Sequence, residues 1–376
     1  MSKNLYCHLP WTHIFALNDH NVPCCIFETG QHQIKLSEYN QHPVILQTRQ
    51  DILDGKIPDA CRRCKIDEER FNHSYRLLHN NFESHLEDGI TTTDSLEVYH
   101  EVSLMTSNTC NLKCTSCKES SYVRHRELDA MGLLTNKKDI PIHFARNPSI
   151  DSLSSIKFKK LVLLGGEPFF DKVTFNLLEE LANSGRSQSI ELDINTNMTG
   201  ITQEKLDFLV DNFSNVQIKA SIDGIGKVND YLRYGSDWET IDANVKLCKE
   251  YSRNHFNIQL LLVAATSNLS MLRFYQVMEY VEQQDIVDVF LTTVHDPALM
   301  DSTCIPRGLI DDLRKKYSKL KPVSDRNQFV VQSCLNILDN ADDSNFANSL
   351  AWYKKHDQHR GTSVFDIFPE LLEYDR

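Results

Sequence analysis

Cysteines with metal-ligand spacing are the most informative residues of this chain of 376 amino acids, which contains 11 of them. One group lies in the N-terminal part and consists of Cys7, Cys24, Cys61 and Cys64, with Cys25 directly beside Cys24. A second, compact group consists of Cys110, Cys114 and Cys117. Thiolates bind zinc and iron–sulfur clusters, so both groups indicate metal or redox chemistry. The others, Cys248, Cys304 and Cys334, stand alone, and we expect them to be buried core thiols.

The compact group has the spacing C-x3-C-x2-C and follows an apolar run, Glu101–Met105, that has the character of a strand. Three thiolates on one loop can hold a cubane cluster and leave its fourth iron open, which is typical of a catalytic site. A zinc site with three cysteines, completed by His125 or by a distant residue, is the alternative reading. Loops at the carboxyl ends of parallel strands are where α/β folds place their chemistry.

The next strand-like run, Lys160–Leu164, leads directly into Gly165, Gly166, Glu167 and Pro168. Adjacent glycines let the backbone approach a ligand closely, and the carboxylate of Glu167 can accept a hydrogen bond from an amino group. Taken alone, the same four residues also fit an ordinary tight turn between a strand and a helix.

Six apolar, β-rich runs alternate with amphipathic helices from about residue 99 onward, which predicts a parallel sheet with helices packed on it. The runs are Glu101–Met105, Lys160–Leu164, Ile190–Ile194, Val216–Ile222, Ile258–Ala265 and Val287–Val294. A closed barrel needs eight such units. We therefore expect an α/β fold with a partial (β/α)6 barrel rather than a closed one; an open doubly wound sheet is the other arrangement that fits.

The cysteine motif, the Gly-Gly-Glu-Pro turn and the βα alternation occur here in the order that resembles the radical SAM superfamily. The resemblance covers roughly residues 99–295. It implies that Cys110, Cys114 and Cys117 hold a [4Fe–4S] cluster whose open iron binds S-adenosylmethionine. It further implies cofactor-binding roles for the turn residues Gly165, Gly166, Glu167 and Pro168.

The same resemblance extends, residue by residue, to later strand ends. It implies that Ser221 and Asp223 lie near the ribose of the cofactor and that Arg233 meets its carboxylate. A solvated loop cation is the other reading of Arg233. Asn197 is carried over as a cofactor-binding residue, although Met198 replaces the glycine that the family often has after it.

Four thiolates of the N-terminal group would fully ligate either zinc or a second iron–sulfur cluster, and the spacing does not choose between them. The pattern resembles the auxiliary-cluster modules called SPASM and twitch domains, which implies that Cys7, Cys24, Cys61 and Cys64 hold an auxiliary [4Fe–4S] cluster. Cys25 is a substitute for Cys24. Unlike those modules, this one precedes the catalytic domain. We expect His8 and His13 to pack beside the cysteines rather than to ligate metal.

Four segments follow from these patterns. We expect a small Cys-rich metal-cluster domain over residues 1–75, a connecting helix or linker over 76–98, a radical SAM core over 99–300 and a helical C-terminal extension over 301–376. The run Arg124-His125-Arg126 fits a solvated helix face, or else a patch for an anionic substrate or an electron donor.

The formal net charge of −12 gives no bulk attraction for a phosphate backbone, so we expect no nucleic-acid partner. No apolar run reaches membrane-spanning length, and the first residues lack the apolar core of a signal peptide. These features predict a cytoplasmic protein with no membrane partner.

The resemblance implies an enzyme that cleaves S-adenosylmethionine reductively and uses the resulting 5′-deoxyadenosyl radical to abstract hydrogen from a substrate. We expect oxidation or cross-linking of a peptide or protein side chain, with the auxiliary cluster as electron acceptor and a flavodoxin or ferredoxin as electron donor. A dehydrogenase or epimerase acting on a sugar or nucleoside is the alternative, and a zinc-stabilised interaction protein is a more remote one. No residue is assigned as proton donor or acceptor.

Overall fold

The computed structural model describes residues 6–16, 25, 34–72, 74–87, 90–94, 96–117, 121–134, 153–295 and 297–375. These residues form two compact units. The first unit takes its residues from Met1–Ser107, Phe144–Ile194 and Asp207–Gln217, and the second from Asn108–His143, Asn195–Leu206 and Ile218–Arg376.

All six predicted strands are present, within two residues of their predicted ends. They are β2 (Tyr99–Met105), β4 (Phe158–Leu164), β5 (Glu191–Thr196), β6 (Asn215–Ser221), β8 (Ile258–Thr266) and β9 (Val289–Thr293). Three strands were not predicted: β1 (His13–Ala16), β3 (Lys113–Cys114) and β7 (Arg233–Tyr234). Each of these has only two to four residues, which is too short for a period-2 pattern to be recognised.

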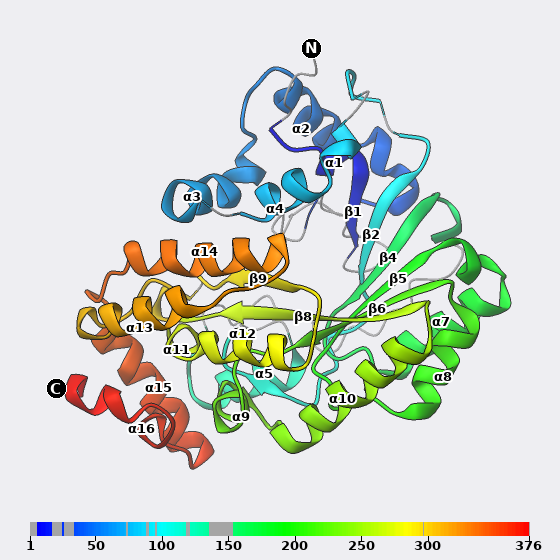
Figure 1. Cartoon of the computed structure of the whole chain (residues 1–376). Helices are drawn as coiled ribbons and strands as arrows, with labels where there is room; N and C mark the ends of the chain where they lie inside the picture. Colours follow the sequence, from blue (N-terminus) through cyan, green and yellow to red (C-terminus); the bar gives the residue numbers. More distant parts are fainter. Residues whose placement is uncertain are drawn as a thin grey trace. The chain divides into compact units, whose positions relative to one another are not determined.

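Parallel strands form a sheet in the order β1-β2-β4-β5-β6-β8-β9. In the first unit, β2 pairs in parallel with β1 on one side and with β4 on the other, and β4 pairs with β5 (Figure 1). In the second unit, β8 pairs in parallel with β9. Parallel strands with intervening helices confirm the predicted α/β class and partial barrel.

Helices account for most of the remaining described residues. Those of the first unit are α1 (Leu9–Thr12), α2 (Pro43–Leu53), α3 (Arg62–Phe71), α4 (Tyr75–Phe82) and α7 (Lys172–Asn183), with the 3₁₀ turns η1 (Leu36–Gln41), η2 (Asp59–Cys61), η3 (Ser84–Glu87) and η4 (Arg186–Ser189). Those of the second unit are α5 (Tyr122–Ala130), α9 (Lys227–Leu232), α10 (Trp238–Asn254), α11 (Asn268–Met271), α12 (Phe274–Gln283), α13 (Arg307–Lys319), α14 (Asp325–Asp339), α15 (Phe346–Arg360) and α16 (Val364–Ile367), with η5 (Ala298–Met300) and η6 (Pro369–Tyr374). Helix α8 (Gln203–Asn212) takes residues from both units.

Apolar residues at helical spacing form the packing faces of the helices. In α7, Leu177, Leu178 and Leu181 are buried, and the Asp171 carboxylate caps the N-terminus by accepting a hydrogen bond from the Val173 backbone N–H. The thiols of Cys248, Cys304 and Cys334 are all buried, as predicted for core residues. No described helix has the length and hydrophobicity that a membrane span requires.

Candidate functional site

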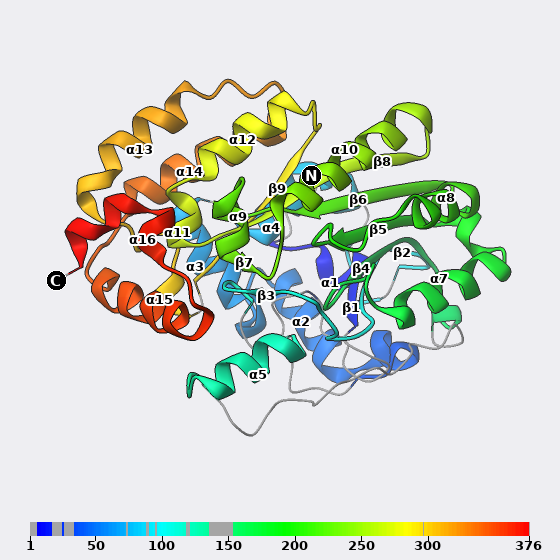
Figure 2. The same cartoon turned by 90° about the horizontal axis from the view of Figure 1, so that it is seen from below.

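The compact cysteine group lies on residues 108–117, here called the cysteine loop. This loop follows β2 and contains the two-residue strand β3. Strand β3 lies beside β7 (Figure 2) and pairs antiparallel with it. This pairing puts Cys114 directly opposite Arg233. The Thr115 backbone N–H donates to the Leu232 carbonyl at 2.7 Å and continues this pairing. The Cys117 N–H donates to the Cys114 carbonyl at 3.1 Å, so the last two cysteines share one turn.

The Cys110 sulfur accepts hydrogen bonds, Cys114 is buried, and Cys110 and Cys117 are half-buried. Cys110 Sγ accepts from the Leu112 backbone N–H at 3.5 Å and from Asn197 Nδ2 at 3.8 Å. Burial raises the pKa of the Cys114 thiol to about 12, although the nearby Arg233 guanidinium acts in the opposite direction. A metal ion or cluster that binds Cys114 must therefore displace a proton, and its binding will strengthen as pH rises.

Arg233 and Asp223, both carried over from the family resemblance, form a buried ion pair with 2.9 Å between Arg233 Nη1 and Asp223 Oδ2. The other oxygen of Asp223 accepts from the Ala265 backbone N–H at 2.8 Å. Arg233 is thus a buried, paired cation and not a solvated one. Its Nε is buried and has no hydrogen-bond partner among the described residues. A carboxylate ligand of the kind implied for this residue fits such an unused donor.

Three further residues from the sequence analysis occupy distinct positions. Asn197 follows β5 and bonds both Cys110 Sγ and Asn111 Oδ1, so it is held against the cysteine loop. Ser221 is the last residue of β6 and is half-buried. Met198 has φ +69°, the backbone conformation that the family's glycine would adopt without strain.

The Gly-Gly-Glu-Pro turn follows β4 in the first unit. A Cβ on Gly165 would lie 2.5 Å from the Ser107 carbonyl oxygen, and the residue has φ +127°, so only glycine fits. The Gly166 N–H donates to the same carbonyl at 2.9 Å, which ties the turn to the residue that precedes the cysteine loop. Glu167 is 1% exposed and accepts from the Phe169 N–H at 3.0 Å.

A buried charge network, which sequence reasoning missed, donates hydrogen bonds to backbone carbonyls of the cysteine loop. Arg124 is 1% exposed, so the expectation of a solvated or docking face is wrong for this residue. Its side chain pairs with Glu127 and donates to the Cys117 carbonyl at 3.1 Å and to His356 Nε2 at 2.9 Å. The only hint in the sequence is the spacing of Arg124 and Glu127, which puts them on one helix face.

Arg360, the last residue of α15, completes the network from the C-terminal part of the chain. Its guanidinium bonds both oxygens of Glu127 at 2.9 and 2.8 Å, and Nη2 also donates to the Lys113 carbonyl at 2.7 Å. Burial by itself would raise the pKa of Glu127, but Arg360 and Arg124 outweigh it and lower that pKa to about 2. Glu127 is therefore ionised at neutral pH and keeps both guanidinium groups in place.

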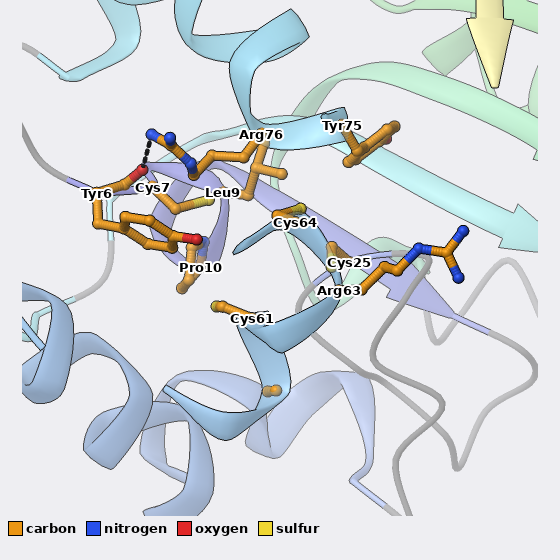
Figure 3. A pocket seen from close by; sticks show the side chains of 11 residues that line it. Tyr6, Cys7, Leu9, Pro10, Cys25, Cys61, Arg63, Cys64, Tyr75 and Arg76 are labelled. Atoms are coloured by element: carbon orange, nitrogen blue, oxygen red, sulfur yellow. Dashed lines mark hydrogen bonds between the residues drawn. The ribbon is translucent and has the colours of Figure 1, made fainter. Parts of the chain in front are cut away.

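The N-terminal cysteines line one cavity in the first unit (Figure 3). Cys7 precedes α1, Cys61 ends η2 and Cys64 lies in the first turn of α3. The fourth cysteine on this cavity is Cys25. Cys24, the expected ligand, lies outside the described residues, and Cys25 is the cysteine expected to substitute for it.

Backbone amides point at two of these sulfurs. Burial raises the pKa of Cys7 well above its usual value and that of Cys64 to about 11, while hydrogen bonds from the Leu9 and Arg76 backbone N–H groups oppose the shift. Amide donors of this kind stabilise a thiolate once a metal has replaced the proton. Arg76 and Tyr6 form part of the cavity lining. Arg76 Nη1 donates to the Tyr6 carbonyl at 2.7 Å, and Arg76 Cζ lies 4.2 Å from the centroid of the Tyr6 ring.

Comparisons with known proteins find similarity at the level of fold. No family model and no curated protein matches the sequence. Among solved structures, native anSMEcpe with bound AdoMet is 18% identical over 53% of this chain and 53% of its own, with a TM-score of 0.42. Streptococcus suis SuiB bound to precursor peptide SuiA is 16% identical over 73% of this chain and 52% of its own, with a TM-score of 0.38.

A third solved structure, TYW1 with a lysine-pyruvate adduct bound, is 13% identical over 70% of this chain and 85% of its own, with a TM-score of 0.35. The similarity to these structures is in the half-barrel of parallel strands. The chain spans about half the length of the anSMEcpe and SuiB structures. Evidence for the function of this chain therefore comes from its own residues.

Replacing Gly165 by alanine should destabilise the protein by about 1–3 kcal/mol, because it forces a Cβ against the Ser107 carbonyl at a backbone angle that disfavours alanine. Gly185→Ala is the matched control, since Gly185 has φ +76° but nothing within 4 Å of its Cβ position. Urea unfolding measures both. Equal losses in the two variants would show that the close approach to Ser107 contributes nothing.

Replacing Arg360 by alanine should lower the free energy of unfolding by about 3–5 kcal/mol, since it leaves the Glu127 carboxylate buried and short of a partner. His359→Ala, an exposed neighbour on α15, is the control. A loss below about 1 kcal/mol, the value of an exposed ion pair, would contradict a supporting role.

Proposed function

We propose that this chain is a radical SAM enzyme whose Cys110, Cys114 and Cys117 hold a [4Fe–4S] cluster that binds S-adenosylmethionine. The observation that carries the proposal is the C-x3-C-x2-C loop after β2, held by strand pairing so that Cys114 faces Arg233. The donor set fits the group, because three thiols lie on one loop and leave a fourth coordination position to the cofactor.

When bound, the reduced cluster would supply one electron to S-adenosylmethionine, whose C5′–S bond would break to give methionine and a 5′-deoxyadenosyl radical. The residues of the chain would bind the cluster and the cofactor and orient them. We assign Arg233 to the cofactor carboxylate through its unused buried Nε, with Asp223 fixing the guanidinium. Asn197 holds the Cys110 sulfur, and its amide nitrogen is shared with Asn111.

The other carried-over roles belong to the same proposal. Gly165, Gly166 and Glu167, with Pro168 as part of the turn, are assigned to the methionyl amino group, and Ser221 and Asp223 to the region of the ribose. The close approach of Gly165 to the Ser107 carbonyl fixes the turn, and Glu167, which is 1% exposed, supplies the carboxylate that the proposal assigns to the amino group. A flavodoxin or ferredoxin is the proposed electron donor in a cytoplasmic setting.

We further propose that Cys7, Cys25, Cys61 and Cys64 hold an auxiliary [4Fe–4S] cluster, in a domain over residues 1–75 that resembles a twitch module. All four line one cavity, and four thiolates satisfy every iron of a cubane. Such a cluster is suited to accept one electron from the substrate radical that hydrogen abstraction would leave. On that basis we propose a peptide or protein side chain as substrate, the class that is bound in the SuiB structure.

Reduced, iron-loaded protein should release 5′-deoxyadenosine from S-adenosylmethionine, and Cys114→Ala should abolish the release because the catalytic cluster loses a ligand. Chromatography of the products measures this. Cys248→Ala, which removes a buried core thiol of α10, is the control and should cleave like the wild type. Cleavage retained by the Cys114 variant, or a colourless protein that contains only zinc, would overturn the proposal.

The identity of the fourth auxiliary ligand can be decided by counting iron in the background of Cys114→Ala. Adding Cys25→Ser should remove about four irons per chain, because the auxiliary cluster loses a ligand. Adding Cys24→Ser instead should leave that iron in place. The reverse result would make Cys24 the ligand, and no loss in either variant would show that the cavity holds no such cluster.

A further inference from the structure

A second group of metal-binding side chains lies in the first unit, apart from all the cysteines. One nitrogen of His13, one nitrogen of His79 and one carboxylate oxygen of Glu83 all lie within 4.8 Å of one another. His13 is on β1, and His79 and Glu83 lie one turn apart at the end of α4. The sequence analysis expected His13 only as a packing residue.

The distances place Glu83 between the two rings. Glu83 Oε2 lies 2.7 Å from His79 Nδ1 and 3.6 Å from His13 Nε2. On the other side of the carboxylate, His100 Nε2 lies 4.0 Å from Oε1. The His13 ring centroid is 5.0 Å from that of His79 and 5.5 Å from that of His100, so several imidazoles surround one carboxylate.

His13 Nε2 is buried and has no hydrogen-bond partner within the described part of the chain. His13 as a whole is 4% exposed, so water does not compensate for the missing bond. An unpaired imidazole nitrogen at this depth is costly unless a ligand uses its lone pair. This atom is the one that faces Glu83 Oε2.

The hydroxyl of Thr12 determines which nitrogen of His13 carries the proton. Thr12 Oγ1 donates to the His8 carbonyl at 3.1 Å and lies 2.7 Å from His13 Nδ1 and 2.8 Å from His8 Nδ1. Because the single hydroxyl proton of Thr12 is donated to the His8 carbonyl, the hydroxyl oxygen accepts hydrogen bonds from the rings of His8 and His13. Both Nδ1 atoms therefore carry hydrogen, and the Nε2 lone pair of His13 is free for a metal, as in sites where an outer partner fixes the tautomer.

The carboxylates of Glu83 and Glu101 near His13 carry more negative charge than the neighbouring Lys160 neutralises. Glu101 Oε2 lies 3.8 Å from His13 Nε2, on the strand that pairs with β1. The neighbouring Lys160 is held by other carboxylates, at 3.7 Å from Glu191 and 3.9 Å from Asp193. A cation bound between His13 and Glu83 would offset the surplus charge of the two glutamates.

We propose that His13, His79 and Glu83 bind a divalent transition-metal ion, zinc or iron(II), at a site distinct from both cysteine groups. Two imidazoles and one carboxylate are a donor set that both ions accept, with positions left for water or for His100. The ion would link β1 to the end of α4. It would lie close to the N-terminal cysteine cavity, because Tyr75 lines that cavity and its ring centroid is 4.3 Å from that of His79.

Cobalt(II) titration of the full-length chain with its iron–sulfur sites loaded tests the proposal. Loading first occupies the thiolates, so further cobalt reports on nitrogen and oxygen ligands. We expect one equivalent to bind, with weak d–d absorption and without the intense thiolate-to-cobalt charge-transfer band. Competition with zinc or iron(II) should displace it.

Variants of the half-buried ligands identify the site. Glu83→Gln and His79→Gln should each weaken cobalt binding at least tenfold, whereas His85→Gln, an exposed histidine on η3, should leave it unchanged. Thr12→Val should weaken binding by about tenfold, and Thr12→Ser, which keeps the hydroxyl, should restore it. Circular dichroism of the metal-free proteins confirms that each variant is folded.

Two results would overturn the proposal. The first is an absence of cobalt binding by the iron-loaded wild type, which would make the group a hydrogen-bonded histidine cluster only. The second is equal binding by the wild type and Glu83→Gln, or binding with a thiolate charge-transfer band. Neither result depends on the radical chemistry, since no turnover is measured.

Discussion

Buried guanidinium groups that donate to backbone carbonyls hold both cysteine-bearing segments in place. Glu127 is the centre of one such network, because its ionised carboxylate keeps Arg124 and Arg360 together in a space from which water is excluded. A buried ion pair is costly unless its remaining donors are satisfied, and here they are used on the carbonyls of Lys113 and Cys117. The charge network and the cysteine loop therefore stabilise each other.

The same principle operates at the N-terminus. Arg49 is fully buried and donates to the Pro10 carbonyl at 3.0 and 2.8 Å and to the Thr93 carbonyl at 3.0 Å. Arg76, paired with Glu68, donates to the Tyr6 carbonyl beside Cys7. Short segments without regular partners cannot satisfy their own carbonyls. Arginine side chains from α2 and α4 donate to these carbonyls instead.

Local pattern predicted a good part of this molecule. The strands were found because apolar runs of five to nine residues record their burial directly in the sequence. Strand β1 was missed because only four residues form it, and its pairing with β2 depends on a segment more than eighty residues away. Arg124 was misread because a guanidinium looks solvated until its partners Glu127 and His356 are placed around it.

The sequence by itself determined the positions of six strands, the two cysteine groups and the glycine turn, since spacing and periodicity are properties of neighbouring residues. Tertiary structure alone decided that Cys25 lines the N-terminal cavity, that Arg233 is buried against Asp223, and that His13 meets Glu83. Each of these depends on chain segments that are distant in sequence. Burial then gives Arg233 Nε and His13 Nε2, which lack a hydrogen-bond partner among the described residues, a free-energy cost that neither residue carries in isolation.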